Sequence, residues 1–458
     1  MLVITIIIII ILATITINAV VGDNGLIYQA RSSKDMSSNE IAETEGSMNN
    51  LFDEYANIMA EDSETPGIPT LPTDGSFNSE KGVNTPKLEN NMELIRFAET
   101  QHEWVEDETN SEYSYIAGSG TSDNTVSHWA NAKVTIDGVE SYFVWIPRYA
   151  YKITYYTDES KTTESTTKTA YGTIDVKFIK GTGKIAADGT ECKYASESPN
   201  ATQEYVIHPA FTTEAEYGGG WDVELAGIWI GKYEASSVEG NSDSSTGDNV
   251  TTKTVKVQPG VSSWRNITIG NMYTVSKNYA RNLKSHMLKN SEWGAVAYLT
   301  DSKYGRNGTE IGFGNQGYIT GGGTEKSYVE NIDQSSTGNV YGVYDLRGVS
   351  YGRVAGYYSG GNSNYLNNGL SFTSTKTSDA YATVYSGTVA STAYKYGDAT
   401  YETNGWHRDY NEFVNSNYPF FDYGGYYIND EGYTGIFCNG LNNGSSDNRI
   451  SFRLALVV

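Results

Sequence analysis

The stretch VTIDGVESYFVWI, residues 134–146, decides the fold class because it places a turn between two runs of β-branched and aromatic residues. Val134-Thr135-Ile136 and Tyr142-Phe143-Val144-Trp145-Ile146 flank Asp137-Gly138, a dipeptide typical of two-residue hairpin turns. Pro147 lacks an N–H for the strand ladder, so the second strand is expected to end there. The stretch therefore predicts a β-hairpin.

The rest of the globular sequence extends this pattern. Short apolar runs between Gly, Asn, Ser and Asp predict further strands at residues 174–179 and 227–233, with the β-rich texture starting near residue 131. Helices are few: one is expected over residues 272–283, and another over residues 291–299 with Ser291 as N-cap. In the second helix, the spacing of its apolar residues predicts packing by one face. A sheet-rich body with few helices belongs to the α+β class.

Composition excludes one class of partner. The chain has 458 residues, with 32 Lys and Arg against 55 Asp and Glu, for a net charge of −23. A field of this sign repels phosphate backbones, so we expect no nucleic-acid partner. The sequence is rich in Tyr (37) and Gly (48), which predicts a neutral-polar, aromatic surface.

Cysteine and histidine give no metal motif. Cys192 and Cys438 are far apart in the sequence, and the five histidines are isolated from one another, so neither CxxC modules nor an HExxH pair is present. We predict no metal site. Two buried free thiols are the favoured state of the cysteines, and a disulfide between them stays open.

The first 22 residues are apolar and carry no charged side chain. As a helix they would be ~33 Å long, enough to cross a bilayer core of ~30 Å. A cleaved signal peptide is the competing interpretation, but no basic residue precedes the apolar run. The segment resembles the prepilin-like N-terminal helix of bacterial surface proteins. We therefore expect a single-pass membrane protein with most of its chain extracellular on a bacterial surface, and a pilus-like assembly is an alternative.

An acidic segment follows the apolar one. Residues 33–80 contain eleven carboxylates and one basic residue, Lys34. Charge repulsion without apolar periodicity is typical of a solvated tether. We expect residues 23–130 to form a largely disordered acidic linker.

Six short motifs occur in a recognisable order after this linker. They are Lys232-Tyr233-Glu234-Ala235-Ser236, Val261-Ser262-Ser263-Trp264, Asn290-Ser291-Glu292-Trp293, Gly342-Val343-Tyr344-Asp345-Leu346, Gly424-Gly425 and Ser451-Phe452-Arg453-Leu454-Ala455-Leu456. Their order resembles that of the signatures KYEVT, VSW, PTEAEWE, GLYDMSGNVWEW, RGGSW and GFRLA in the formylglycine-generating sulfatase-modifying-factor family. The resemblance implies a C-type-lectin-like domain of the sulfatase-modifying-factor type over residues 227–458. It also implies a β-rich companion segment over residues 131–226.

The chemistry of that family does not transfer fully. The family enzyme uses two thiols close together, whereas the matched region here contains only Cys438, so we expect no catalysis. A divergent oxidase of the formylglycine-generating type is an alternative. The resemblance also implies a structural calcium ion, but residues 349–353 lack the family's Asn, Trp and Glu. Asp345 is more simply a turn former, and the sequence names no cofactor.

Residues 419–458 alternate Gly and apolar positions with Tyr, Asn, Ser and Asp, the residue types of antibody-like binding loops. We expect a ligand, either an extracellular glycan or a protein, to bind here. The predicted ligand-binding residues are Tyr423, Tyr426, Tyr427, Asn429, Asp430, Tyr433, Asn439, Asn442, Asn443, Ser445, Ser446, Asp447 and Asn448. The segment resembles the variable regions of C-type-lectin-like proteins diversified by retroelements. The alternative is a Gly- and Asn-rich turn region whose tyrosines cap the sheet.

Overall fold

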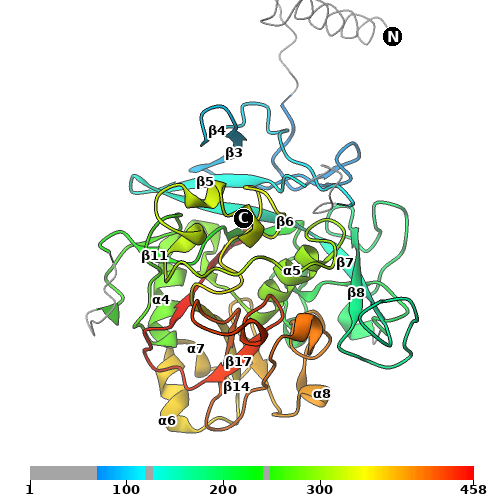
Figure 1. Ribbon diagram of the computed structural model, residues 1–458, viewed down its shortest axis with the longest axis vertical. Helices are drawn as coiled ribbons and strands as arrows, with labels where there is room; N and C mark the ends of the chain where they lie inside the picture. The colour runs from blue at the N-terminus through cyan, green and yellow to red at the C-terminus, as the bar shows by residue number, and fades with distance from the viewer. Residues whose placement is uncertain (1–69, 119–126, 198, 241–247) are drawn as a thin grey trace, which may run out of the picture. The chain divides into compact units, whose positions relative to one another are not determined.

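The computed structural model describes residues 70–118, 127–197, 199–240 and 248–458 (Figure 1). Residues 70–458 form one compact unit, separate from residues 1–69. None of the described helices is long and apolar enough to cross a membrane. The predicted membrane helix, residues 1–22, lies outside the described residues.

The largest sheet has seven strands, and every neighbouring pair is antiparallel. In spatial order it consists of β13 (His286–Met287), β19 (Leu454–Leu456), β10 (Gly227–Gly231), β6 (Val139–Pro147), β5 (Asn131–Ile136), β3 (Met92–Ala98) and β4 (Glu103–Glu106). The predicted hairpin is its centre: Ile136 pairs with Val139. Asp137 and Gly138 both have positive φ, at 50° and 79°, which is the type I′ turn that suits strand twist.

A second sheet carries the C-terminal region. Its order is β15 (Thr383–Tyr385), β14 (Tyr351–Tyr358), β16 (Phe420–Tyr423) and β17 (Asn439–Asn442), and β18 (Ile450–Phe452) also pairs with β14. In this sheet β16 lies between β14 and β17, both of which are labelled in Figure 1. Between β18 and β19 the chain passes from this sheet to the first, so the C-terminal strands join the two sheets.

Smaller sheets complete the β structure. They are β8 (Gly172–Phe178), β7 (Tyr149–Tyr155) and β9 (Val206–Ile207); β1 (Phe77–Asn78) and β2 (Val83–Asn84); and β11 (Ser236–Ser237) and β12 (Val255–Lys256). In β8 the residues Ile174, Val176 and Phe178 are buried and alternate with less buried polar ones, as a strand with one face on the core requires. The predicted strands at 174–179 and 227–233 are thus present, each shorter at its C-terminal end.

The helices are α4 (Ile269–Tyr279), α5 (Asn290–Asp301) and the one-turn helices α6 (Ser363–Leu366), α7 (Leu370–Thr373) and α8 (Ala390–Ala393). The expected helix at 272–283 is α4 followed by a 3₁₀ turn, Arg281–Leu283. The predicted class, α+β and β-rich with few helices, is confirmed.

Helix α5 differs from its prediction in two respects. Its N-cap is Lys289 rather than Ser291, whose Oγ instead donates to the Gly218 carbonyl at 2.6 Å. All twelve residues of α5 are buried, so it does not pack by a single face. At Gly294 an added Cβ would lie 1.7 Å from the Gly397 carbonyl oxygen, so the chain at Gly397 approaches the helix where only glycine fits.

The structure differs from the predicted domain organisation at two places. Within the expected linker, residues 23–130, the described residues from Thr70 on include strands, because β3 extends the central sheet through pairs such as Leu94 with Ala132. Residues 23–69 and 119–126 of that linker lie outside the described residues. Residues 131–226 and 227–458 are not separate bodies, since β6 and β10 pair along five residues each and share one core.

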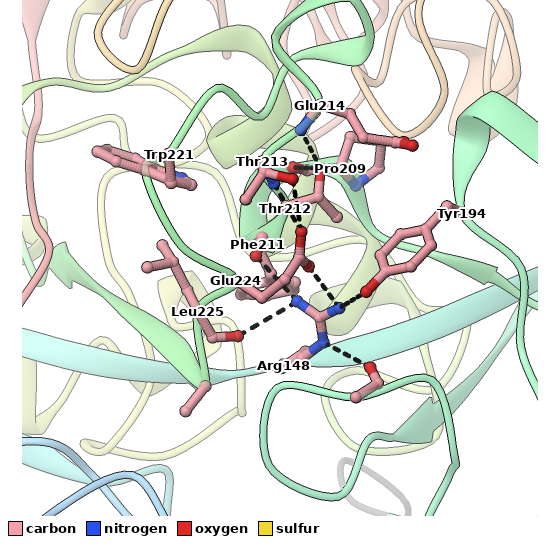
Figure 2. Close-up of polar contacts among 12 residues, drawn as sticks. Arg148, Tyr194, Pro209, Phe211, Thr212, Thr213, Glu214, Trp221, Glu224 and Leu225 are labelled. Carbon is pink, nitrogen blue, oxygen red and sulfur yellow. Dashed lines mark hydrogen bonds and ion pairs between the residues drawn. The ribbon is translucent and has the colours of Figure 1, made fainter.

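Arg148, directly after β6, pins a long loop to the sheet (Figure 2). Its buried guanidinium donates to the carbonyls of Phe211 at 2.9 Å and Leu225 at 3.3 Å, and it pairs with Glu224 at 2.7 Å. The other oxygen of Glu224 accepts from the Thr213 backbone at 2.8 Å. This network fixes the chain just before β10 begins.

Candidate functional site

A cavity of about 360 Å³ opens between β14, β16, β17 and the loops around them. We call it the C-terminal cavity. It is lined by Tyr351, Arg353, Tyr410, Glu412, Tyr418, Asp422, Tyr433, Cys438, Gly440, Leu441, Asn442, Asn443, Ser445, Asp447, Arg449 and Ile450. Five of the thirteen predicted binding residues are among them: Tyr433, Asn442, Asn443, Ser445 and Asp447.

Exposed tyrosines gather at the rim of this cavity. Among the described residues, only four tyrosines are substantially exposed. Tyr410, Tyr418 and Tyr433, at 43%, 46% and 50%, line the C-terminal cavity, whereas Tyr171, at 36%, lies elsewhere. The rings of Tyr410 and Tyr433 are 5.2 Å apart, and the Tyr410 hydroxyl donates to Glu412 at 2.9 Å. These rings present apolar faces and polar edges to solvent.

The floor of the cavity is a buried polar network. Arg353 Nε donates to Asn442 Oδ1 at 3.1 Å, and Asn442 Nδ2 donates to Asp422 Oδ2 at 3.1 Å. Arg353 also donates to the Ser445 carbonyl at 2.7 Å, which holds the loop after β17 in place. Burial raises the pKa of Asp422 to about 6, although the Arg353 charge opposes the shift. The floor is therefore rigid and internally satisfied.

Four further tyrosines form an interlocking row, which we call the tyrosine ladder. In order they are Tyr318, Tyr427, Tyr426 and Tyr351. Successive ring centroids are 4.6, 6.0 and 5.2 Å apart. Arg265 stacks 3.6 Å above the Tyr318 ring, and Arg449 lies 6.0 Å from the Tyr426 ring. Since Tyr351 and Arg449 also line the C-terminal cavity, the ladder and the cavity form one continuous surface.

Three predicted binding residues have buried side chains. Tyr423 belongs to the core: its ring stacks on Trp293 at 5.0 Å, and its hydroxyl donates to the Asp398 carbonyl at 3.0 Å. Asn439 Nδ2 donates to the Glu412 carbonyl, and Asn442 belongs to the cavity floor. These residues support the site and present almost no surface of their own.

The remaining predicted residues lie on the loops around the site. Asn429 closes the turn after the ladder, with its Oδ1 accepting from the Tyr426 backbone at 3.0 Å. Asp430, Ser446 and Asn448 are exposed. The sequence prediction missed Tyr351, Tyr410, Tyr418 and Arg449. The three tyrosines precede residue 419, where the predicted segment starts, and arginine is not among the residue types, Tyr, Asn, Ser and Asp, on which the prediction rests.

The thiols have no redox partner within the described residues. Cys192 and Cys438 are both free and buried. Burial raises the pKa of Cys192 to about 11 and that of Cys438 well above its usual value. Cys438 lines the C-terminal cavity, but as a protonated thiol it is a weak nucleophile. No group of three or more potential metal ligands occurs in the described ranges.

The motif residues that suggested the family resemblance are structural. Lys232 is buried, and its Nζ donates to Asn131 Oδ1 and to two carbonyls. Asp345 accepts from the Gly321 backbone at 2.7 Å and from the Glu234 backbone at 3.1 Å. Both of its oxygens are thus engaged as in a turn former, and they do not fit a calcium site. The acids Glu234 and Asp345 line none of the cavities described here.

No protein-family model matches the chain, and no curated protein matches it. Two solved structures align with it at low similarity. The structure of PvdO from Pseudomonas aeruginosa aligns with a TM-score of 0.30 and 10% identity, covering 75% of this chain and 100% of that chain. Treponema denticola variable protein 1 aligns with a TM-score of 0.32 and 10% identity, covering 72% of this chain and 99% of that chain.

Proposed function

We propose that this protein is a non-catalytic binding protein of the bacterial surface. Its ligand, a glycan or a protein, occupies the C-terminal cavity and extends over the tyrosine ladder. In this proposal the body is a C-type-lectin-like domain, tethered to the membrane by residues 1–22. The observation that carries the proposal is that three of the four exposed tyrosines in the described residues surround one cavity.

The physical chemistry of tyrosine supports this role. A tyrosine ring offers a large contact area with only two rotatable side-chain bonds, so ordering it on binding costs little entropy. The rings of the tyrosine ladder already pack against one another, so they lose still less conformational entropy on binding. Tyrosine and arginine are also the residue types that dominate binding energy at interfaces, and Arg265 and Arg449 lie against the ladder. The surface is therefore largely preorganised.

The division between floor and rim also supports diversification. Arg353, Asp422 and Asn442 bond to one another and to backbone, whereas Asp430, Ser446 and Asn448 are exposed. Exposed positions of this kind tolerate substitution with little effect on stability. We include in the proposal that a retroelement varies these codons. A locus without a reverse transcriptase and a near-identical template repeat would exclude this part.

The binding role is tested on a glycan array and on a panel of purified bacterial and host surface proteins. Tyr418→Ala and Tyr433→Ala, singly and together, should weaken binding of any wild-type hit by tenfold or more, on the scale of a hot-spot loss of ~2 kcal/mol. Their melting temperature should stay near the wild-type value, because both rings are exposed. Tyr365→Ala, on α6 and outside the cavity, is the matched control. Undiminished binding by the double variant would contradict the proposal.

The oxidase and pilin alternatives have separate tests. Aldehyde formation on a cysteine-bearing sulfatase peptide, with copper and oxygen supplied, would replace the binding role with an oxidase. A methylated, leader-free N-terminus on purified filaments would support pilus-like assembly.

A further inference from the structure

A second and larger cavity, of about 630 Å³, lies behind the rim of the first. We call it the His407 cavity. The side chains that matter to the argument are Lys161, Tyr171, Glu310, Arg347, Trp406 and His407. The two cavities are adjacent. Gly432 lines the His407 cavity, and its carbonyl accepts a hydrogen bond at 2.8 Å from the backbone N–H of Tyr410, which lines the C-terminal cavity.

The loop that carries His407 is held in a strained conformation. Gly405, His407 and Arg408 have φ angles of 81°, 53° and 68°. For residues other than glycine, this left-handed region costs on the order of 1–3 kcal/mol each, and such strain concentrates at ligand sites. The loop is fixed by a hydrogen bond of 2.8 Å between His407 Nε2 and Asp301, and by the His407 ring, which lies parallel to Phe437.

His407 lines the cavity and uses only one of its ring nitrogens within the described residues. Nε2 is engaged by Asp301, while Nδ1 bonds to no other described residue. Burial by itself lowers the pKa of His407, but the Asp301 hydrogen bond and the carboxylates of Glu310 and Asp409 outweigh it and raise the pKa to about 9. At neutral pH both ring nitrogens therefore carry protons. Nδ1 remains able to donate to a ligand.

Two further cations line the same cavity. Arg347 uses one terminal nitrogen for the Ile311 carbonyl at 2.7 Å and its Nε for Thr434, which leaves its other terminal nitrogen for a ligand. Lys161 lines the cavity and forms no ion pair with a described residue. Two acids line the cavity as well: Glu159 is paired with Arg408, and burial raises the pKa of Glu310 while the charges of His407 and Arg347 oppose that rise.

One exposed aromatic side chain, Tyr171, lines the cavity, whereas Trp406 is buried and its Nε1 donates to the Thr169 carbonyl at 3.3 Å. A flat aromatic ring packs well against the C–H face of a sugar ring, while the three cations suit a carboxylate. The combination of an exposed ring with convergent cationic donors distinguishes this cavity from the C-terminal one, whose arginines are bonded to their own loops.

We propose that the His407 cavity binds the acidic residue of a glycan, a sugar ring that carries a carboxylate. The carboxylate accepts hydrogen bonds from His407 Nδ1, Arg347 and Lys161, and the ring packs against Tyr171. The site is separate from the C-terminal cavity, so either assignment can fail without the other.

The test is calorimetric titration of the full chain with 3′-sialyllactose, with lactose as its neutral counterpart. We expect binding of the sialylated sugar only, and an affinity that falls as salt is added. His407→Gln and Lys161→Met should each weaken binding by about tenfold or more, the loss of one charge-assisted hydrogen bond. Lys161→Met is a surface change that keeps the assay valid if the His407 variant fails to fold. Lys376→Met, an exposed lysine outside both cavities, should bind as the wild type does.

Four results would overturn the assignment. They are absence of binding by both 3′-sialyllactose and glucuronate, equal binding of lactose, equal binding of a tetraglutamate peptide, and unchanged affinity in both the His407 and Lys161 variants. Tyr418→Ala and Tyr433→Ala separate the two proposals: retained sialyllactose binding supports the His407 cavity, and its loss would place the sugar in the C-terminal cavity instead.

Discussion

His407 keeps a positive charge inside the protein because the carboxylate groups around it outweigh the cost of burial. Asp301 accepts its hydrogen bond, Glu310 and Asp409 lie close, and its pKa rises to about 9 from an ordinary 6.5. A group whose pKa is raised by folding stabilises the folded state fully at pH values below its pKa in the unfolded chain. This contribution is lost as the pH rises through its pKa in the folded protein. The window here runs from pH 6.5 to 9, and the effect on the free energy of unfolding is about 3 kcal/mol.

We predict that wild-type stability falls between pH 7 and pH 10 by more than that of His407→Gln. Urea unfolding at a series of pH values measures this difference. If the wild-type and variant curves run parallel over this range, His407 does not carry the raised pKa.

Lys232 shows why a motif residue can be essential without taking part in chemistry. Its buried Nζ donates to Asn131 Oδ1 at 2.8 Å and to the carbonyls of Val340 at 2.6 Å and Gly342 at 2.8 Å. Lys232→Met would leave three buried acceptors unpaired, and we expect a loss of about 3–5 kcal/mol in the free energy of unfolding. Denaturant titration measures it, with Lys376→Met as the exposed control. A loss below that of an ordinary surface substitution would contradict the assigned role.

At the scale of elements, helix α5 is constrained on every side. The chain at Gly397 packs so closely on Gly294 that a Cβ would meet its carbonyl oxygen at 1.7 Å. Gly294→Ala should therefore destabilise the protein by about 1–3 kcal/mol despite the higher helix propensity of alanine. Gly183→Ala, where nothing lies closer than 3.7 Å, is the matched control. Equal stability of the two variants in thermal unfolding would show that the backbone at Gly397 can move away from the added methyl group without a measurable loss of stability.

The same helix shows how far the sequence determines the elements. Its position and N-terminal Glu292 follow from local signals, since Glu292 accepts from the Lys289 backbone at 2.8 Å. Its burial does not follow from them, because the polar residues at its ends are satisfied by partners outside the helix: Ser291 by Gly218, Glu292 by His286 and Asp301 by His407. The amphipathic pattern therefore predicted an exposed face that tertiary hydrogen bonds cover. The sequence predicted only part of the binding surface, because tertiary structure brings Tyr351, Tyr410 and Tyr418 to it from earlier segments of the chain.

At the scale of the molecule, the central sheet extends further toward the N-terminus than composition indicated. The acidic average of residues 33–80 led to a linker prediction through residue 130, although Met92–Ala98 carries the apolar pattern of a half-buried strand. In the structure β3 covers the edge of β5, and the Tyr115 hydroxyl donates to the Trp145 carbonyl at 2.7 Å. Net charge over a long window cannot reveal a seven-residue strand within it.

Two truncations test this boundary. A chain that starts at Thr70 retains the whole compact unit and should unfold in one cooperative transition at the melting temperature of the full chain. A chain that starts at residue 131 loses β1 to β4 together with the core residues Tyr115 and Trp129, leaves the edge of β5 unpaired and uncovers Val134. An unpaired apolar edge of this kind favours association between chains, so we expect this shorter chain to aggregate on size-exclusion chromatography. If it stayed monomeric and melted at the same temperature, residues 70–130 would be an appendage, and the sheet would be complete without them.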